Sequence, residues 1–144
     1  MQHNQLPVLD TVILHYILRD KKYMLEVSKS AKAAYFDLSF QTFYALLHSA
    51  FLDPNIKEVL SLEAFLEYCK TKNAAGQVGN FRIIYEDAVA CKINDSVLHD
   101  NDFNFYLQKL RERYNAALAE EALKNIAVAL TEGHDVKDIN KIFG

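Results

Sequence analysis

The chain has 144 residues, of which 51% are hydrophobic and 24% are charged, so it is long enough to bury a core without metal or disulfide support. Its 4 glycines and 2 prolines are too few for a turn-rich sandwich or barrel, or for a disordered linker. With 16 basic and 19 acidic side chains the net charge is −3, which excludes a surface that is basic throughout. Any contact with nucleic acid must therefore be local.

Cysteine usage and hydropathy indicate a protein of a reducing compartment. Cys69 and Cys91 have no partner at metal-ligand spacing, so neither a disulfide framework nor a zinc site is expected. The longest apolar runs, 43–47 and 126–130, are far shorter than the roughly 20 residues of a membrane-spanning helix. No basic segment followed by an apolar one begins the chain, so no secretory signal is expected. We expect a cytoplasmic protein without a membrane partner.

The first half of the chain shows four apolar stripes at helical spacing. A helix is predicted over 8–19 and a short one around 23–27. Ser39 is expected to cap a third helix, which ends before Pro54, and Ser61 to open a fourth that ends in the break at 72–76. The inward positions of the third and fourth helices are Phe40, Phe43, Tyr44, Leu47 and Phe51, then Leu62, Phe65, Leu66 and Cys69.

The second half predicts a helix over 81–92 and a much longer one over about 102–132. The long segment has apolar residues at mostly three- and four-residue steps and contains no glycine or proline, which corresponds to about 45 Å of helix. Gly133 is the expected stop, and Asp135 can cap a short terminal helix. Its apolar face is expected to dock on another surface and consists of Val136, Ile139, Ile142 and Phe143.

These elements predict an all-α protein, a small helical bundle followed by a long helical hairpin. The expected division is a globular bundle over 1–76, a hairpin over 77–133, and the start of a linker helix over 134–144. The long helix outruns the bundle, so its apolar residues Leu118, Leu123 and Ile126 need a partner surface. The alternative is that the long helix lies across the bundle and belongs to its core.

No catalytic or metal site is predicted. His15, His48, His99 and His134 are scattered, with no two at ligand spacing on one helical face. Glu63 lies one turn from Glu67, a pattern typical of a solvated helix face. The aromatic residues fall mostly on the apolar stripes, which favours core packing over stacking on bases. Residues 19–32 carry five basic and two acidic side chains, the one plausible phosphate-facing patch, although a solvated surface is the stronger interpretation.

The order of these features is similar to that of a known family. The stretches that carry the similarity are 8–10 running to 18–20, 35–37 followed by Phe40, Phe43 and Leu46, then 60–66, 102–107, 110–114, and Leu123, Ile126 and Leu130. Over nearly the whole chain they resemble the N-terminal domain of DnaB-like replicative DNA helicases, in a divergent form found in phages. The aromatic-polar-His-Arg pattern of bacterial members is replaced by residues 37–41, so contacts assigned there are not transferred.

The resemblance implies a non-catalytic collar domain that pairs subunits, supports a hexameric ring, and docks primase and in some systems a helicase loader. The RecA-like motor, with its ATP and Mg, would lie elsewhere in the parent helicase, because this sequence has no G-x-x-x-x-G-K-[ST] phosphate loop and no cofactor site of its own. DNA would be contacted only weakly or indirectly, in the host cytoplasm if the protein is phage-encoded. The expected pairing surface is Tyr114, Leu118, Leu123, Ile126 and Leu130, with 136–143 as the docking face of the linker.

A second class of function fits the same residues. A stand-alone helical adaptor, such as a helicase loader or inhibitor, would also need an all-α bundle and an apolar docking helix. The two classes differ in whether the natural reading frame continues past Gly144 into a phosphate-loop motor.

Overall fold

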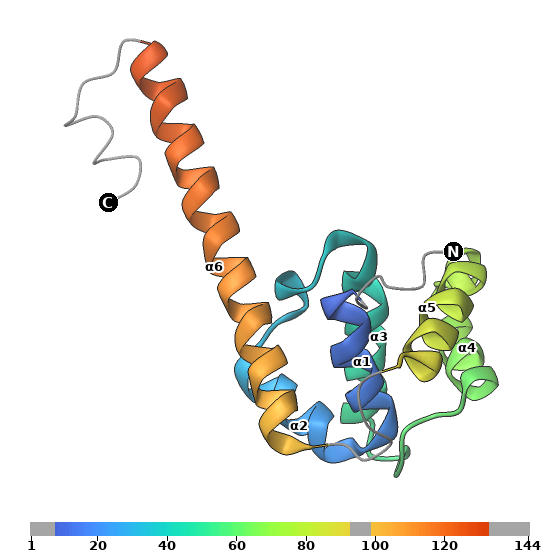
Figure 1. Ribbon diagram of the computed structural model, residues 1–144. Helices are drawn as coiled ribbons and strands as arrows, with labels where there is room; N and C mark the ends of the chain where they lie inside the picture. The colour runs from blue at the N-terminus through green and yellow to red at the C-terminus, as the bar shows by residue number, and fades with distance from the viewer. Residues whose placement is uncertain (1–7, 93–98, 133–144) are drawn as a thin grey trace, which may run out of the picture. The chain divides into compact units, whose positions relative to one another are not determined.

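The structure, a computed structural model, describes residues 8–92 and 99–132. The predicted stop at Gly133 and the terminal helix with Val136, Ile139, Ile142 and Phe143 lie outside the described residues. Within those two ranges the chain contains six α-helices and two 3₁₀ turns and no strand, so the predicted all-α class is confirmed (Figure 1). They are α1 (Leu9–Arg19), α2 (Lys21–Ser30), η1 (Ala33–Tyr35), α3 (Leu38–Leu52), α4 (Leu62–Thr71), η2 (Ala75–Gln77), α5 (Val78–Ala90) and α6 (Asp100–Thr131).

Helix α1 is the central element of the bundle. Every residue from 12 to 17 is buried, including His15, whereas the periodicity predicted burial of only one face. A helix that is buried on all sides needs neighbours around it, and α1 packs mainly against α5 and α2. His15 Nδ1 donates to the Ala88 carbonyl at 2.8 Å, which ties α1 to the end of α5. His15 Nε2 lies 3.5 Å from the Arg19 guanidinium, one turn further along α1.

Two aromatic clusters connect the helices. In the first, the Phe43 ring lies 5.0 Å from Phe65 and 5.7 Å from Phe81, so α3, α4 and α5 meet around one buried ring. In the second, Tyr23 lies 5.1 Å from Tyr16 and 4.7 Å from Phe103. Tilted and edge-to-face rings at these separations add to the apolar burial. The second cluster joins α1 and α2 to the first turn of α6.

The starts of α4 and α3 test two predicted N-caps, of which one is correct and one is wrong. Ser61 is the N-cap of α4, and its hydroxyl accepts from the Ala64 amide at 3.5 Å. Ser39 is not a cap, because α3 already begins at Leu38 and the extended residue before it is Asp37. The reason is tertiary: the buried carboxylate of Asp10 on α1 accepts from the Asp37 amide at 2.8 Å. That contact fixes the chain at Asp37 and starts the helix earlier.

The predicted division into a 1–76 bundle and a 77–133 hairpin stays a prediction. By its internal contacts the chain forms two compact units, whose boundary lies inside α6, between Arg111 and Glu112. Helix α5, expected as the antiparallel neighbour of the long helix, packs instead against α1 and α4 as part of the first unit. Its buried face, Phe81, Ile84, Tyr85 and Ala88, is filled by those helices. The long helix itself is confirmed, with 32 residues.

Candidate protein interface on the long helix

The first turns of α6 belong to the bundle and are fixed by polar and apolar contacts. The Tyr23 hydroxyl donates to Asp100 Oδ1 at 2.8 Å, and Lys22 Nζ lies 3.3 Å from the same oxygen. These partners, Tyr23 first, lower the pKa of the Asp100 carboxyl, and Asp100 in turn raises the pKa of Lys22. Three turns of α6 then bury Phe103, Leu107 and Leu110. The alternative, in which the long helix belongs to the core, therefore describes this first part of α6.

The buried register of α6 does not continue through the second unit. Phe103, Leu107 and Leu110 are spaced by four and three residues, so the same face next presents Tyr114, Ala117, Glu121 and Lys124. The last two are exposed charged residues. A face that carries charges at successive turns is a solvated face. The bundle-type apolar pattern therefore ends near Tyr114.

A different apolar register begins at Ala116 and extends to Leu130. Its members recur at steps of three and four residues, which is the spacing of a coiled-coil contact line. Leu123 and Leu130 are 68% and 54% exposed, whereas Ile126 is half-buried. We call this line the α6 seam; it consists of Ala116, Ala119, Leu123, Ile126 and Leu130.

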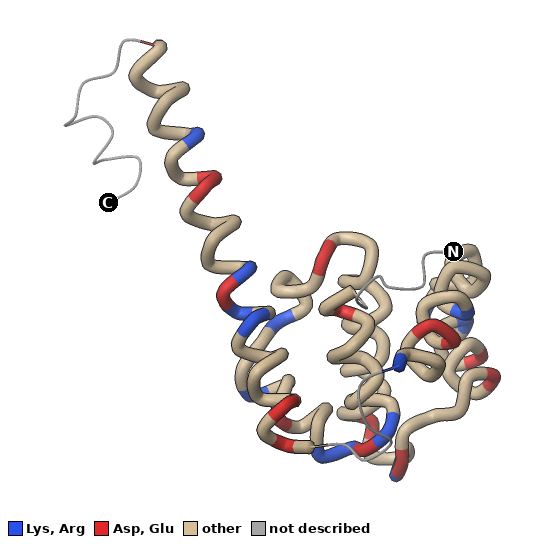
Figure 2. Tube along the Cα trace, in the orientation of Figure 1, with Lys and Arg blue, Asp and Glu red and all other residues tan. Residues whose placement is uncertain are grey.

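Between residues 114 and 131 the charged side chains lie away from the α6 seam. Residues 114–119 and 125–131 contain no charged side chain, which leaves Glu120, Glu121 and Lys124 between them. Figure 2 shows these long uncharged stretches of α6 in tan. A fifteen-residue stretch of helix with such a continuous apolar side needs an apolar surface to cover it. The seam is therefore the strongest candidate for a functional site in the described chain.

The five residues predicted as a pairing surface do not all share one face. Leu123, Ile126 and Leu130 belong to the α6 seam, whereas Leu118, 48% exposed, lies outside it. Tyr114 falls in the register of the buried bundle residues. Sequence reasoning missed Ala116 and Ala119, because alanine is a weak hydrophobic signal. Their heptad spacing could have identified them. The predicted linker face at 136–143 lies outside the described residues.

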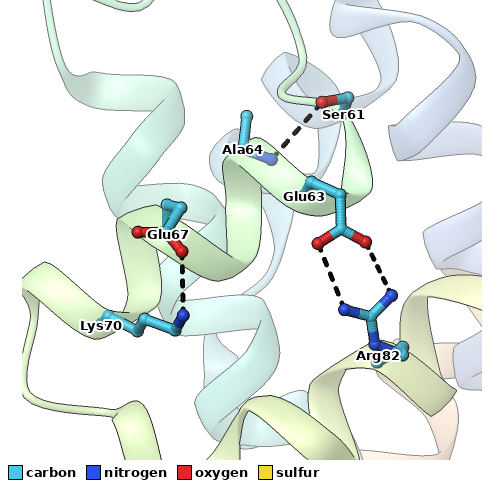
Figure 3. A network of polar contacts seen from close by, with 6 residues as sticks. All are labelled: Ser61, Glu63, Ala64, Glu67, Lys70 and Arg82. Carbon is cyan, nitrogen blue, oxygen red and sulfur yellow. Dashed lines mark hydrogen bonds and ion pairs between the residues drawn. The ribbon is translucent and has the colours of Figure 1, made fainter.

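The other candidate groups are engaged in structural contacts. Glu63 forms a two-bond ion pair with Arg82, at 2.7 and 3.2 Å, and Glu67 pairs with Lys70 (Figure 3). The hydrogen bond from Arg82 lowers the pKa of the Glu63 carboxyl. Glu63 thus links α4 to α5, and Glu67 stabilises one exposed turn of α4. Among the described residues no three His, Cys, Asp or Glu side chains come together as a metal-ligand group.

The histidines and cysteines also have packing environments. The His48 ring stacks on Tyr44, with centroids 5.8 Å apart, and lies beside Phe51. His99 is exposed, and His134 lies outside the described residues. Burial raises the pKa of the Cys69 thiol to about 11 and also raises that of Cys91, so both thiols stay protonated near neutral pH.

Most of the basic side chains in 19–32 already have partners. Lys21 Nζ donates to the Lys57 carbonyl at 2.8 Å, Lys22 pairs with Asp100, and Lys29 pairs with Glu26. Of these partners, Asp100 adds one negative charge from outside the segment. The segment has the character of a solvated face.

Comparison of the chain with protein-family models, with curated proteins and with solved structures finds no match. In the ranges that the structure describes, none of the helices combines the length and the hydropathy required to cross a bilayer.

Proposed function

We propose that this chain is a non-catalytic collar domain of a ring-shaped replicative DNA helicase, in which it pairs subunits. The observation that carries the proposal is the α6 seam. It presents a 3–4 apolar repeat on a helix of 32 residues, with Leu123 and Leu130 more than half exposed. Such a repeat is the pattern by which helices associate.

The position of the seam supports a pairing role over a core role. Phe103, Leu107 and Leu110 complete the bundle core before the seam begins. None of the seam residues belongs to that core cluster. Association with a second copy would remove its apolar side chains from water, at about 25 cal/mol per Å² before ordering costs are subtracted.

Under the same proposal the ATP chemistry belongs to another domain of the helicase, while the collar also binds other proteins. ATP and Mg would act in a motor domain of the parent helicase, because this sequence carries no phosphate loop. Primase, and in some systems a loader, would dock on the collar, and DNA would be contacted indirectly. The protein would act in the cytoplasm, of the host cell if it is phage-encoded.

The test replaces two seam residues by charged ones, in the variant L123K/I126K. Sedimentation equilibrium should show wild-type dimers, with the dimer dissociation constant raised about 100-fold or more in the variant, because an unpaired charge in an apolar contact costs several kcal/mol. The matched control is A117K/V128K, which adds the same charge outside the seam. It should pair like wild type.

Two outcomes would contradict the proposal. A wild-type chain that stays monomeric over the whole concentration range would show that the seam does not pair copies. Equal weakening by the control variant would show that net charge, and not the seam, controls association. Far-ultraviolet circular dichroism of each variant checks that the helices remain.

A further inference from the structure

One position in the last turns of α6 is covered, although most of its neighbours are open to solvent. Ala129 is 5% exposed, whereas Ala119 and Ala127, alanines of the same helix, are exposed. Because all positions of an α-helix have the same backbone geometry, this contrast indicates a cover that comes from outside the helix. Ala129 does not belong to the core cluster of the bundle. Its cover is therefore a separate contact.

The cover extends along one face of the helix. Ala122 and Ile126 are half-buried, and with Ala129 they follow at steps of four and three residues. Leu123 and Val128, which point to other sides of α6, are exposed. We call this the covered face; it consists of Ala122, Ile126 and Ala129. Ile126 also belongs to the α6 seam, so the covered face borders the seam along one edge.

The cover of Ala129 comes from the same chain. The burial is present in a single copy, so a second copy does not provide it. Ala129 lies in the second compact unit, Glu112–Gly144. Within the described residues this unit contains only the later part of α6 and Glu132. What remains of the unit is the segment 133–144, which lies outside the described residues.

The sequence of 133–144 is that of a segment able to dock on α6. Its apolar residues recur at steps of three between polar ones: Val136, Ile139 and Ile142. Gly133, directly after α6, permits the chain to reverse its direction. In helical form the eight residues 136–143 would span about 10 Å, which equals the length of the covered face along α6. The segment is thus close enough and long enough to reach the whole face.

We propose that the segment 136–143 binds the covered face of α6 in its own chain. The small methyl groups of Ala122 and Ala129 let the segment approach the helix closely, and its larger apolar side chains leave water against them. The contact needs only one copy, so it is independent of the pairing through the α6 seam. Another protein can take up the segment only after displacing it from α6.

Thiol labelling of the full chain with a maleimide tests whether the face is covered. A129C places a thiol on the covered face, and A127C is the matched control at an exposed alanine of the same turn. A129C should react at least about tenfold more slowly than A127C, because the rate follows the exposure of the thiol. Mass spectrometry of the labelled peptides separates these thiols from Cys69 and Cys91. Equal rates for A129C and A127C would overturn the proposal.

Substitutions within the segment identify it as the cover. In the A129C background, I139N/I142N should raise the labelling rate to within about threefold of A127C, because the buried amides would lack partners and the segment would leave the face. The matched control K137N/K141N changes two polar positions of the same segment. It should leave A129C protected.

The outcome of this test does not depend on the α6 pairing. Protection within one chain is the same at every protein concentration, whereas protection by a second copy disappears on dilution. A129C that stays protected in I139N/I142N, or that loses its protection on dilution, would overturn the proposal. A chain that fails to pair through the α6 seam would leave all of these rates unchanged.

Discussion

At the scale of a single residue, two buried tyrosines differ in whether the hydroxyl has a hydrogen-bond partner. Tyr85 and Tyr44 are 8% and 2% exposed. The Tyr85 hydroxyl donates to the Leu60 carbonyl at 2.8 Å. The Tyr44 hydroxyl has no hydrogen-bond partner in the described part of the chain, while its ring stacks on Phe36 at 4.5 Å. The ring of Tyr44 contributes to packing, and its hydroxyl carries a desolvation cost.

Phenylalanine substitutions should therefore have opposite effects at these two positions. Y85F should lower the free energy of unfolding by about 1 kcal/mol, because the Leu60 carbonyl loses its donor. Y44F should leave that free energy unchanged or raise it by up to about 1 kcal/mol, because a buried unpaired hydroxyl is removed. Urea denaturation of both variants beside wild type measures the difference. A loss in Y44F as large as in Y85F would reveal a partner for the Tyr44 hydroxyl.

The buried hydroxyl of Tyr44 also predicts that the free energy of unfolding decreases at alkaline pH. Burial raises the pKa of Tyr44 to about 12, from 10.0 in the unfolded chain. The native state thus retains a proton that the unfolded state releases, so the stability contribution is full below pH 10 and is lost as pH rises toward 12. Y44F should lose less stability than wild type over this range, by up to about 2 kcal/mol at pH 12. Parallel curves for the two proteins would contradict the assignment.

At the scale of the element, helix starts depend on which group satisfies the first amides. Ser61 does this locally for α4. At α3 the Ser39 hydroxyl instead donates to the Asp37 carboxylate at 3.1 Å, one residue inside the helix. The contact that holds the start of α3 comes from Asp10, 27 residues away along the chain.

Alanine substitutions separate these two serines. S61A should reduce the free energy of unfolding by about 1 kcal/mol, because an amide of the first turn loses its acceptor. S39A should change it by less than about 0.5 kcal/mol, since the serine makes only an exposed side-chain contact. Thermal and urea unfolding of the two variants provide the comparison. A larger loss for S39A than for S61A would show that Ser39 has a capping role after all.

At the scale of the whole molecule, the boundary between Arg111 and Glu112 separates the first compact unit from the second. A chain truncated after Arg111 retains Phe103, Leu107 and Leu110, which complete the core. It should unfold cooperatively, with a free energy within about 1 kcal/mol of the full chain. It should also lose association through the α6 seam, as sedimentation equilibrium would show. A broad, non-cooperative transition would mean that residues beyond Arg111 are needed for folding.

The sequence by itself determined the helices, because helical periodicity is a local property. The stripe of α1, the start of α4 at Ser61 and a helix of about 30 residues at the end all depend on residues within a few turns of one another. The seam residues Leu123, Ile126 and Leu130 were also predictable, since their spacing is local. Which surface they would contact is not encoded within one helix.

Only the tertiary structure decided which apolar faces meet. The apolar stripe of α5 could pack against any apolar surface. In the folded chain it packs against α1 and α4 rather than against the long helix. In the same way a carboxylate on α1 displaced Ser39 from the start of α3, and the Ala88 carbonyl gave His15 a buried partner. These contacts join residues 27 and 73 positions apart, and such distances leave no periodic signal in the sequence.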